Sequence, residues 1–380
     1  MASDTKRIVI LGGGYGGIKA AEALAGHEGI DVLLIDKNRY HYLQTESYNL
    51  IASNLSLREI TLSLEELTAG LGSAFRFVRD EALTLEEEAV VGRKGRYPYD
   101  YLILATGSVT RMPRVFASDR LFGVKKLANA LHLKHAFENL LLRHMSGERE
   151  SSRIVVIGGG SSGVEIAAEM QHYLNRSSLY HGIRVTLVAD LFLAELDEAS
   201  RQKAREILES AGVEIVEKLV RSVEEGVLCF EGERMPFAFG VVATGIAPDP
   251  FSGGLTLPRE GEFLKVDETL RVAERIYAVG DCAALRDRQG RLLPPTAQTA
   301  EQSGTQAARN ILRQIRGEPL RPADLKIYGL AIALGGRFAI ALTSYGKVEG
   351  ILAHLGKKMI EKFYKIPLHL KSERTGEHDR

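Results

Sequence analysis

Cysteine is nearly absent from this chain. Its 380 residues include only Cys229 and Cys282, which lie far apart in the sequence. Two such residues can form neither the disulfide framework of a small secreted protein nor a cluster with the spacing of metal ligands. We therefore expect no metal site, and we expect two lone thiols that serve as small packing residues.

The sequence also lacks a charge excess and a long apolar run. Lys plus Arg and Asp plus Glu number 49 each, so no overall charge points to nucleic acid as a partner. Eighteen uninterrupted apolar residues occur nowhere, and the polar residues 1–7 do not resemble a signal peptide. We expect a protein of the cytoplasm that can meet the cytoplasmic face of the cell membrane only peripherally, from the side.

A strand–glycine turn–helix–strand pattern occurs twice in the chain. This pattern is typical of βαβ units in a doubly wound parallel sheet. The expected strand, helix and strand are Lys6–Leu11, Tyr15–Leu24 and Asp31–Ile35 in the first copy, and Arg153–Ile157, Ser162–Leu174 and Arg184–Val188 in the second. The sequence therefore predicts an α/β protein with two Rossmann-like dinucleotide-binding domains.

Two further apolar strands, Tyr101–Leu104 and Gly240–Val242, run into Ala-Thr-Gly tripeptides. Each closes one βαβ copy and crosses to the other domain, with an expected helix over Ala128–His144 between them. The first domain is therefore expected to be discontinuous. Its predicted range is 1–111 and 243–320, the inserted second domain is 112–242, and a C-terminal region is 321–380.

The first glycine turn reads Gly12-x-Gly14-x-x-Gly17. The first glycine allows the tight turn, the second lets the backbone approach a pyrophosphate, and the third lets helix and strand pack closely. The N-terminus of the helix adds free N–H groups and a positive dipole end. Asp36 closes the next strand, where a carboxylate can accept both ribose hydroxyls. This combination predicts a dinucleotide site.

The second glycine turn, Gly158-x-Gly160-x-x-Gly163, repeats the pattern with one departure. Alignment of the two copies places Ala189, and no acid, opposite Asp36. Without that carboxylate, discrimination against a 2′-phosphate is weakened, yet no arginine stands nearby to bind one. A nicotinamide dinucleotide is expected here, and the choice between NADH and NADPH stays open.

Taken together, these residues resemble the pyridine nucleotide–disulfide oxidoreductases over about the first 310 residues. The resemblance includes both glycine turns, both Ala-Thr-Gly strand ends and the string Ile276-Tyr277-Ala278-Val279-Gly280-Asp281. It implies FAD at the first turn, NAD(P)H at the second, and a glutamate, Glu165, near the contact of nicotinamide and flavin. The positions assigned to cofactor binding are Gly12, Gly14, Tyr15, Gly16, Gly17, Asp36, Lys37, Ala82, Ala105, Thr106, Gly107, Gly158, Gly160, Ser161, Ser162, Gly163, Glu165, Ala243, Thr244, Gly245, Gly280, Asp281, Ala297 and Gln298.

One segment distinguishes between branches of that superfamily. Pro294–Gln302 contains Ala297-Gln298-Thr299-Ala300-Glu301-Gln302, which resembles the AQxAxQ motif of type II NADH:quinone oxidoreductases. On a helix, Gln298 and Gln302 share one face, so their amides can bind a quinone carbonyl beside the flavin. The alternative is a polar helix near the flavin, common to all relatives. The resemblance makes Glu165, Gln298 and Gln302 the candidate catalytic residues.

Other acceptors stay open. The region Tyr40–Tyr48 carries no cysteine pair, which excludes the dithiol relay of the disulfide reductases. Cys229 and Cys282 have no obvious partner, which disfavours a sulfide:quinone oxidoreductase. The remaining alternatives are a reductase for another acceptor and a nicotinamide-sensing flavoprotein like the apoptosis-inducing factors. The favoured reaction passes hydride from NAD(P)H to flavin N5 and then two electrons to a membrane quinone.

The C-terminal region is expected to form a hairpin over Tyr328–Leu342, around Gly335-Gly336, and an amphipathic helix over Lys347–Lys365. The helix has one apolar stripe, and six lysines against two glutamates occur in Lys347–Lys371. This composition favours a helix that lies on an anionic membrane, with its lysines outward. The alternative is a helix packed on its own protein or on a second subunit of a homodimer. Ser372–Arg380 is expected to be disordered.

Overall fold

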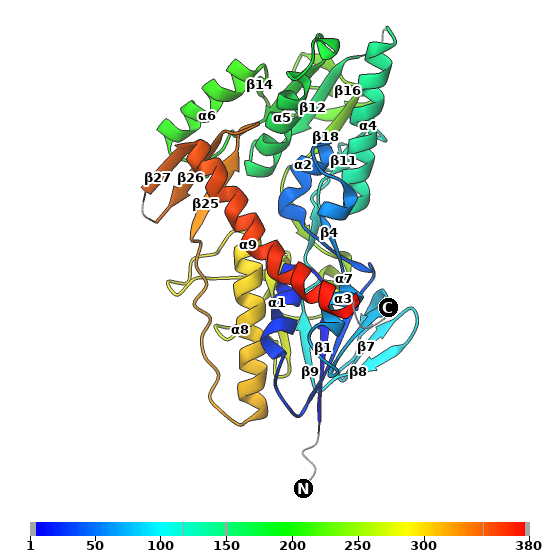
Figure 1. Cartoon of the computed structure of the whole chain (residues 1–380), viewed down its shortest axis with the longest axis vertical. Helices are drawn as coiled ribbons and strands as arrows, with labels where there is room; N and C mark the ends of the chain where they lie inside the picture. Colours follow the sequence, from blue (N-terminus) through cyan, green and yellow to red (C-terminus); the bar gives the residue numbers. More distant parts are fainter. Residues whose placement is uncertain (1–4, 117, 149–150, 345, 377–380) are drawn as a thin grey trace.

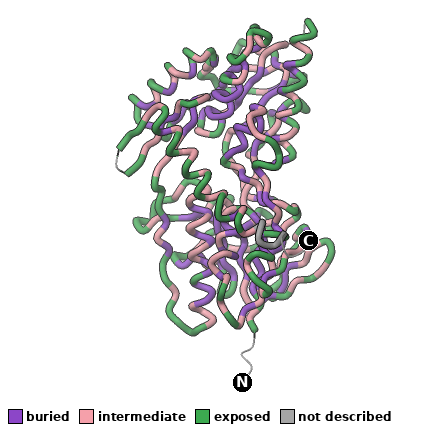
Figure 2. The backbone as a smooth tube through the Cα atoms, in the orientation of Figure 1, coloured by how far each residue is buried: buried purple, intermediate pink, exposed green. Residues whose placement is uncertain are grey.

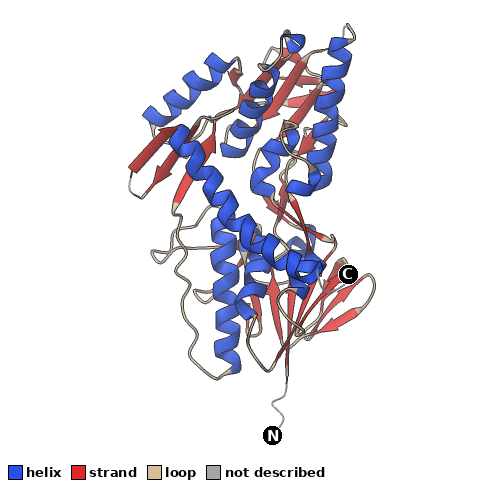
Figure 3. Cartoon of the chain, viewed as in Figure 1, coloured by secondary structure: helices blue, strands red, loops and turns tan. Residues whose placement is uncertain are grey.

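The computed structural model describes residues 5–116, 118–148, 151–344 and 346–376, of which residues 372–376 are described by their backbone alone. Two parallel sheets, each flanked by helices, lie one above the other in Figure 1, and a long C-terminal helix crosses from one to the other. Figure 3 separates these layers by secondary structure. The protein is therefore a mixed α/β molecule with two Rossmann-like folds.

The first sheet has six strands, and its strands come from both ends of the chain. Four parallel pairings give the order β23–β9–β1–β2–β5, and β22 is added antiparallel at the edge. The strands are β22 (Arg271–Ala273), β23 (Ile276–Ala278), β9 (Tyr101–Leu104), β1 (Lys6–Leu11), β2 (Ile30–Asp36) and β5 (Phe75–Arg79). The helix after β1 is α1 (Tyr15–Leu24), as the apolar spacing predicts.

The second sheet is parallel throughout and is formed within residues 121–242. Its order is β11 (Leu121–Gly123), β18 (Phe239–Val242), β12 (Arg153–Ile157), β13 (Arg184–Ala189) and β14 (Glu214–Glu217). Helix α4 (Leu127–Met145) precedes β12, α5 (Ser161–Leu174) follows it, and α6 (Glu198–Ala211) follows β13. The central strands of both sheets are mostly buried (purple in Figure 2), because parallel strands covered by helices on both faces are apolar on both sides. The edge strands β5 and β14 carry charged and exposed residues.

Smaller elements decorate these two folds. The short helices are α2 (Ser47–Ile51), α3 (Leu64–Ala69) and α7 (Pro250–Gly254). The small sheets are β3 (Tyr40–Tyr42) with β4 (Thr61–Ser63), β6 (Ala82–Leu85) with β7 (Ala89–Gly92) and β8 (Arg96–Pro98), β10 (Ser108–Thr110) with β19 (Ile246–Pro248), β15 (Ser222–Glu224) with β16 (Val227–Cys229) and β17 (Arg234–Pro236), and β20 (Arg259–Glu260) with β21 (Phe263–Lys265) and β24 (Ala283–Ala284). The β10–β19 pair joins the two crossings between the folds.

Helix α8 (Ala297–Ile315) lies side by side with α1, in contact along much of its length (Figure 1). The close approach depends on glycine. A Cβ added at Gly304 would lie 2.0 Å from the carbonyl oxygen of Gly16, which no side chain could tolerate. The packing of α8 therefore fixes the N-terminal turn of α1 from behind.

The C-terminal region differs from the expected hairpin and helix in two ways. The hairpin forms from β25 (Gly329–Ala333) and β26 (Ala339–Thr343), but β27 (Gly346–Gly350) adds a third strand where a helix was expected. Val348 fits the apolar spacing of a helix or of a strand, and in the structure it pairs with Ala341 as part of a strand. Helix α9 (Ile351–Gly376) then begins later and extends further than predicted.

The expected disorder from Ser372 onward is wrong as far as Gly376, because α9 continues to that residue. Leu368, close to this end, is fully buried against the first fold, and the Lys371 ammonium pairs with Glu22 of α1. These contacts hold the end of the helix on the protein. Residues 377–380 lie outside the described residues. Among the described helices, none is long and apolar enough to cross a membrane.

Candidate active site

A cavity of about 670 Å³ opens between the two folds. Its walls come from the first glycine turn, the N-terminus of α5 in the second fold, and the C-terminal region, through Ala331 of β25 and Lys357 of α9. The volume lies within the range of small-molecule and cofactor sites. Three parts of the chain that are distant in sequence thus meet at one concave surface.

The first glycine turn has the geometry of a dinucleotide cradle. Gly12 has a φ of +113°, and a Cβ there would lie 2.2 Å from the carbonyl oxygen of Ala105. Gly14, in contrast, faces open space at the cavity wall, so its backbone can be approached closely. Asp36 lines the same cavity, and its carboxylate accepts hydrogen bonds of 2.7 Å from the N–H groups of Gly13 and Asn38. These residues fit the pyrophosphate and ribose of FAD.

Asp281, in the turn after β23, lines the same cavity. Its carboxylate Oδ2 accepts a hydrogen bond of 2.7 Å from the Ser108 hydroxyl and forms an ion pair of 2.6 Å with Lys125. Burial raises the pKa of Asp281, but the charge of Lys125 and the hydrogen bonds from Lys125 and Ser108 together outweigh burial and lower it. Asp281 therefore stays ionised at the cavity wall, and Lys125 is a lining residue that the sequence motifs did not indicate.

The second glycine turn repeats the geometry of the first. Gly158 has a φ of +124°, and a Cβ there would lie 2.3 Å from the carbonyl oxygen of Ala243. Its surroundings differ, because Ala189 offers no carboxylate. Instead Glu195, from the loop after β13, accepts a hydrogen bond of 2.9 Å from the Ser161 N–H at the N-terminus of α5. An anion of the protein itself thus lies at this helix end.

Glu165 of α5 is held in the cavity by two contacts with the C-terminal region. Its Oε1 forms an ion pair of 2.8 Å with the Lys357 Nζ and accepts a hydrogen bond of 3.0 Å from the Ala333 N–H. The Lys357 Nζ also donates to the Ala331 carbonyl oxygen at 3.2 Å and lies 5.3 Å from the centre of the Tyr48 ring. Burial lowers the pKa of Lys357, but the charges of Glu165 and Glu361 outweigh it and raise that pKa.

Lys357 was missed by sequence reasoning, which counted it among outward lysines. One signal could have found it. Lys357 shares a helical face with Ala353, Glu361, Tyr364 and Leu368, and this face packs onto the protein. A lysine in register with such residues is held by a partner rather than by water.

A second carboxyl group lies one helical turn beyond Glu165. Burial raises the pKa of Glu169 to about 7, an effect that the charge of Lys358 partly offsets. The Glu169 side chain accepts a hydrogen bond of 3.2 Å from the Asn54 amide. A group with this pKa can exchange a proton near neutral pH.

His41 joins the first glycine turn to α9. Its Nδ1 lies 2.9 Å from the Gly13 carbonyl oxygen and its Nε2 lies 3.0 Å from the Tyr364 hydroxyl. The Tyr15 ring packs against both side chains. Burial lowers the pKa of His41 to about 4, so the imidazole is neutral at physiological pH. Helix α9 therefore fixes the wall of the first dinucleotide site.

Gln298 and Gln302 lie on α8, but their amides point away from the cavity and toward the connection that follows α8. Gln298 binds Tyr328 and Gly329, and Gln302 binds Lys326, each through both its oxygen and its nitrogen. The structure therefore differs from the expected arrangement of two free amides beside the flavin. Ala297 of the same string does line the cavity.

The other predicted positions divide into two groups. The cavity is lined by Gly12, Gly14, Tyr15, Gly16, Asp36, Lys37, Ala105, Thr106, Gly107, Ser161, Ser162, Glu165, Ala243, Gly245, Gly280, Asp281 and Ala297. It is not lined by Gly17, Ala82, Gly158, Gly160, Gly163, Thr244, Gln298 or Gln302. Gly17 and Gly163 pack against the first glycines of their own turns. The Thr244 hydroxyl donates to the carbonyl oxygen of Arg111. Ala82, in β6, does not reach the cavity wall, whereas its neighbour Glu81 does.

Comparison with known sequences agrees with this geometry. Residues 6–304 match the family of pyridine nucleotide-disulphide oxidoreductases. The chain belongs to this family. Demethylphylloquinone reductase NdbB of Synechocystis sp. is 30% identical over an alignment of 387 positions, which covers 97% of this chain and 94% of the relative. The type II NADH:quinone oxidoreductase of Staphylococcus aureus is 26% identical, with 95% of each chain covered.

Solved structures show the same fold. NDH2 from Plasmodium falciparum, determined in complex with NADH, aligns with a TM-score of 0.85 at 17% identity and covers 98% of both chains. The sulfide:quinone oxidoreductase of Aquifex aeolicus aligns with a TM-score of 0.80 at 18% identity, over 96% of this chain and 92% of that one. At these identities the likeness supports the fold, and the residues of the cavity must decide between acceptors.

Proposed function

We propose that this family member is a type II NAD(P)H:quinone oxidoreductase that uses FAD. The observation that carries the proposal is the composition of the cavity. It joins the FAD-type cradle at Gly12–Gly14 to the N-terminus of α5 in the second fold, and none of its described lining residues is a cysteine. Electrons must therefore leave a flavin here without a dithiol, and the relatives that align over nearly their whole length reduce quinones by name.

The residues of the chain hold the two dinucleotides by different means. Gly14, Asp36 and Asp281 would hold FAD, which when bound supplies the chemistry of accepting hydride and releasing two electrons. Ser161 and Ser162, at the N-terminus of α5, would hold the pyrophosphate of the nicotinamide dinucleotide. NADH is the expected donor, and NADPH stays possible because Ala189 carries no charge.

Reduction of a quinone consumes protons, and the cavity wall contains groups that can deliver them. Lys357 presents its ammonium at the wall, and Glu165 holds that ammonium in place at 2.8 Å. Glu169, whose pKa burial raises to about 7, lies one helical turn further along α5 and interacts electrostatically with Glu165. We assign proton delivery to the Lys357 ammonium, the positioning of that ammonium to the Glu165 carboxylate, and an exchange role to Glu169.

Rapid-mixing experiments test the proposal directly. NADH, and in parallel NADPH, should bleach the flavin absorbance, and a soluble quinone analogue should restore it. The Lys357→Met variant should slow the quinone step by about a hundredfold and leave the NADH step unchanged. Lys362→Met, on the exposed side of the same helix, is the matched control. Absence of quinone-dependent turnover with either nucleotide would contradict the proposed function.

We also propose that α9 attaches the protein peripherally to the cytoplasmic face of a membrane. Its outer face carries large apolar side chains, each more than half exposed: Ile351, Leu352, Leu355, Met359, Ile360, Phe363, Ile366 and Leu370. The lysines contribute less than their number suggests. Lys347, Lys357, Lys358, Lys365 and Lys371 all pair with carboxylates of the same chain. Apolar burial, rather than attraction to anionic lipid, supports the attachment.

Vesicle sedimentation tests this attachment. The variant Leu355→Ser/Phe363→Ser should lose most binding, whereas Leu191→Ser, an exposed leucine of the second fold, should bind like the parent. Binding to neutral vesicles should approach binding to anionic ones, because five lysines are already paired. The parent protein could instead fail to bind vesicles and form a dimer that the double variant disrupts. That result would show that the apolar face binds a second copy of the chain.

A further inference from the structure

Residues 364–371 of α9, called the distal segment below, pack on the first fold. The Tyr364 hydroxyl lies 3.0 Å from His41 Nε2, and the Lys371 ammonium pairs with Glu22 of α1. Between these two contacts, Leu368 is fully buried. In Figure 1 this end of α9, drawn in red, lies over α1 and α3, and it contacts both. The segment is therefore docked by side chains that reach several elements of the first fold.

A proline makes the distal segment depend on these contacts. Pro367 lies inside α9 and has no N–H, so the hydrogen bond to the Phe363 carbonyl oxygen, four residues earlier, is missing. The proline ring also crowds that carbonyl group. Because the helix ladder is interrupted here, packing on the first fold contributes more to the position of residues 368–371 than it would in an unbroken helix.

The contact between Tyr364 and His41 has a defined direction. The Gly13 carbonyl oxygen, 2.9 Å from His41 Nδ1, can only accept, so Nδ1 carries a hydrogen. The imidazole is fully buried and neutral, so Nε2 carries no hydrogen and can only accept. Tyr364 therefore donates to His41, and His41 donates to Gly13. Without the Tyr364 hydroxyl, the buried Nε2 would lose this donor.

Gly13 is held through both of its backbone groups. Its N–H donates to the Asp36 carboxylate at 2.7 Å, and its carbonyl oxygen accepts from His41. In a trans peptide the carbonyl oxygen and the following N–H point in opposite directions, so a fixed Gly13 carbonyl also fixes the direction of the Gly14 N–H. Gly14 lines the cavity at the N-terminus of α1, where the pyrophosphate of FAD would bind. The chain of hydrogen bonds that begins on α9 thus ends at the cofactor site.

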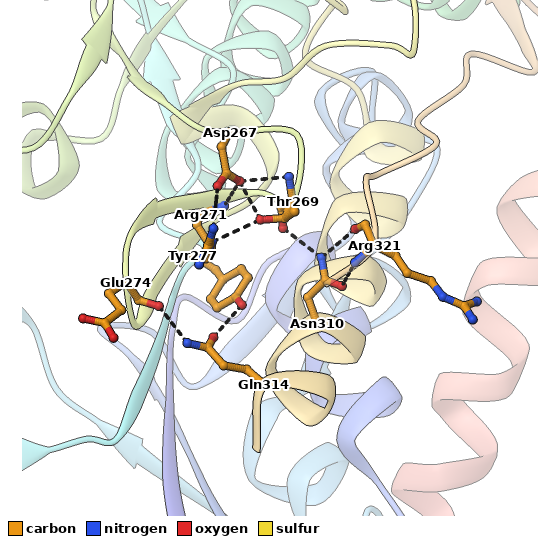
Figure 4. A network of polar contacts seen from close by, with 8 residues as sticks. All are labelled: Asp267, Thr269, Arg271, Glu274, Tyr277, Asn310, Gln314 and Arg321. Atoms are coloured by element: carbon orange, nitrogen blue, oxygen red, sulfur yellow. Dashed lines mark hydrogen bonds and ion pairs between the residues drawn. The ribbon is translucent and has the colours of Figure 1, made fainter. Parts of the chain in front are cut away.

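The other side of the same turn rests on α8, which is anchored in the first fold. Asn310 of α8 is fully buried and donates to the Thr269 carbonyl oxygen at 3.0 Å. Gln314, one turn further, accepts a hydrogen bond of 2.8 Å from the Tyr277 hydroxyl of β23, as Figure 4 shows. The first glycine turn therefore lies between a helix that is tied to the sheet and a helix that is docked through its distal segment.

We infer that Tyr364 is a positioning residue for FAD, which acts through His41 on the Gly13–Gly14 peptide, and that FAD binding and docking of the distal segment therefore stabilise each other. Neither Tyr364 nor His41 lines the cavity, so both act on the cofactor through the turn. A coupling of this kind is reciprocal: FAD must hold the segment as strongly as the segment improves FAD binding. The inference rests on the use of FAD in the proposed function and needs no quinone.

Removal of one hydroxyl tests the first half of the inference. Tyr364→Phe keeps the ring that packs against Tyr15 and removes the donor to His41. Dilution of the full-length holoenzyme, followed by the fluorescence of released FAD, should give a dissociation constant raised by about tenfold. Tyr328→Phe, which removes an exposed hydroxyl, is the matched control and should bind FAD like the parent. Since both side chains act through one chain of bonds, addition of Tyr364→Phe to His41→Gln should weaken FAD binding no further.

Hydrogen exchange tests the reciprocal effect. As FAD is raised from below to above its dissociation constant, exchange of the N–H groups in 364–371 should slow by about tenfold in the parent and hardly change in Tyr364→Phe. A merely structural role would speed exchange in the variant without altering its dependence on FAD. Exchange in α4 of the second fold is the internal reference and should not respond to FAD.

An unchanged dissociation constant in Tyr364→Phe would overturn the inference, as would additive effects of the two substitutions. Equal slowing by FAD in parent and variant, or an equal response of α4, would also overturn it, because FAD would then act on the whole protein. A parent that binds FAD but fails to reduce quinones would contradict the proposed function, and these measurements on FAD and α9 would still decide the inference.

Discussion

The two dinucleotide folds share their turns and differ in what surrounds them. Gly12 and Gly158 adopt nearly the same φ, +113° and +124°. Each lies so close to the alanine of an Ala-Thr-Gly strand end that an added Cβ would clash with its carbonyl oxygen. The first turn is backed by α8 and reached by α9, and its strand ends in the carboxylate of Asp36. The corresponding position of the second fold is Ala189.

This difference teaches how one motif can hold one nucleotide tightly and release another. Elements from three parts of the chain line the cavity beside the first site, which favours retention of a bound cofactor. In the second site, Glu195 already bonds the Ser161 N–H that a pyrophosphate would use. A nucleotide must displace this carboxylate, which favours exchange over retention.

The largest expected effect comes from adding one methyl group to the middle glycine of each turn. Gly14 and Gly160 have ordinary negative φ angles, −79° and −75°, and open space around the position of a Cβ. Alanine should therefore fold normally at both sites and obstruct only the nucleotide. Gly14→Ala should purify with little flavin, and Gly160→Ala should keep its flavin while NADH binds about a hundredfold more weakly.

Flavin absorbance, NADH titration and thermal unfolding of the two variants give the answer. Gly254→Ala, also in open space, should behave as the parent. The assignment of the two sites is contradicted if Gly160→Ala loses its flavin, or if Gly14→Ala weakens only the binding of NADH. Either result would exchange the assignments of the two sites.

Much of this organisation follows from local sequence. The glycine spacing, the β-branched strands and Asp36 are short-range signals, and they predict both βαβ copies and the wall at Gly12–Gly14. Helix α1 even has the predicted ends. Contacts between distant segments have no such signal. Neither the pairing of Lys357 with Glu165 nor that of His41 with Tyr364 can be read from spacing within one element.

Helix α9 shows why the remainder was not predictable. Its apolar stripe was identified correctly as a stripe, but the opposite face was assigned to water. In the structure that opposite face is the packed one, through Lys357, Glu361 and Tyr364, and the apolar face is exposed. Amphipathic spacing defines two faces of a helix, and only the surrounding structure decides which one is buried.

An intermediate effect is expected from His41, which has no counterpart described in the second fold. Its folded pKa of about 4 lies below the ordinary value of 6.5, so the unfolded chain binds the proton more tightly. The stabilising effect of the neutral imidazole is complete above pH 6.5 and is lost as the pH falls toward 4. His41→Gln cannot take up this proton.

Between pH 7 and pH 5 the wild-type protein should therefore lose about 2 kcal/mol more unfolding free energy than the His41→Gln variant. Urea unfolding at the two pH values measures this difference. Parallel pH dependences would show that the buried imidazole does not contribute, and that α9 holds the first turn by other contacts. His135→Gln, at an exposed position of α4, is a matched control and should follow the parent.

The smallest effect concerns the choice of nucleotide in the second fold. Ala189→Asp should supply the carboxylate that Asp36 supplies in the first, accept the ribose hydroxyls and repel a 2′-phosphate. The ratio of kcat/KM for NADH over NADPH should then rise by about tenfold. Glu195→Gln should instead strengthen the binding of both nucleotides alike, because a neutral amide replaces the carboxylate that competes at this helix end with the pyrophosphate that both of them carry. An unchanged ratio in Ala189→Asp, or a ratio altered by Glu195→Gln, would mean that the loop after β13 binds the ribose. The two folds would then differ in where their ribose-binding acid lies, and both would have one.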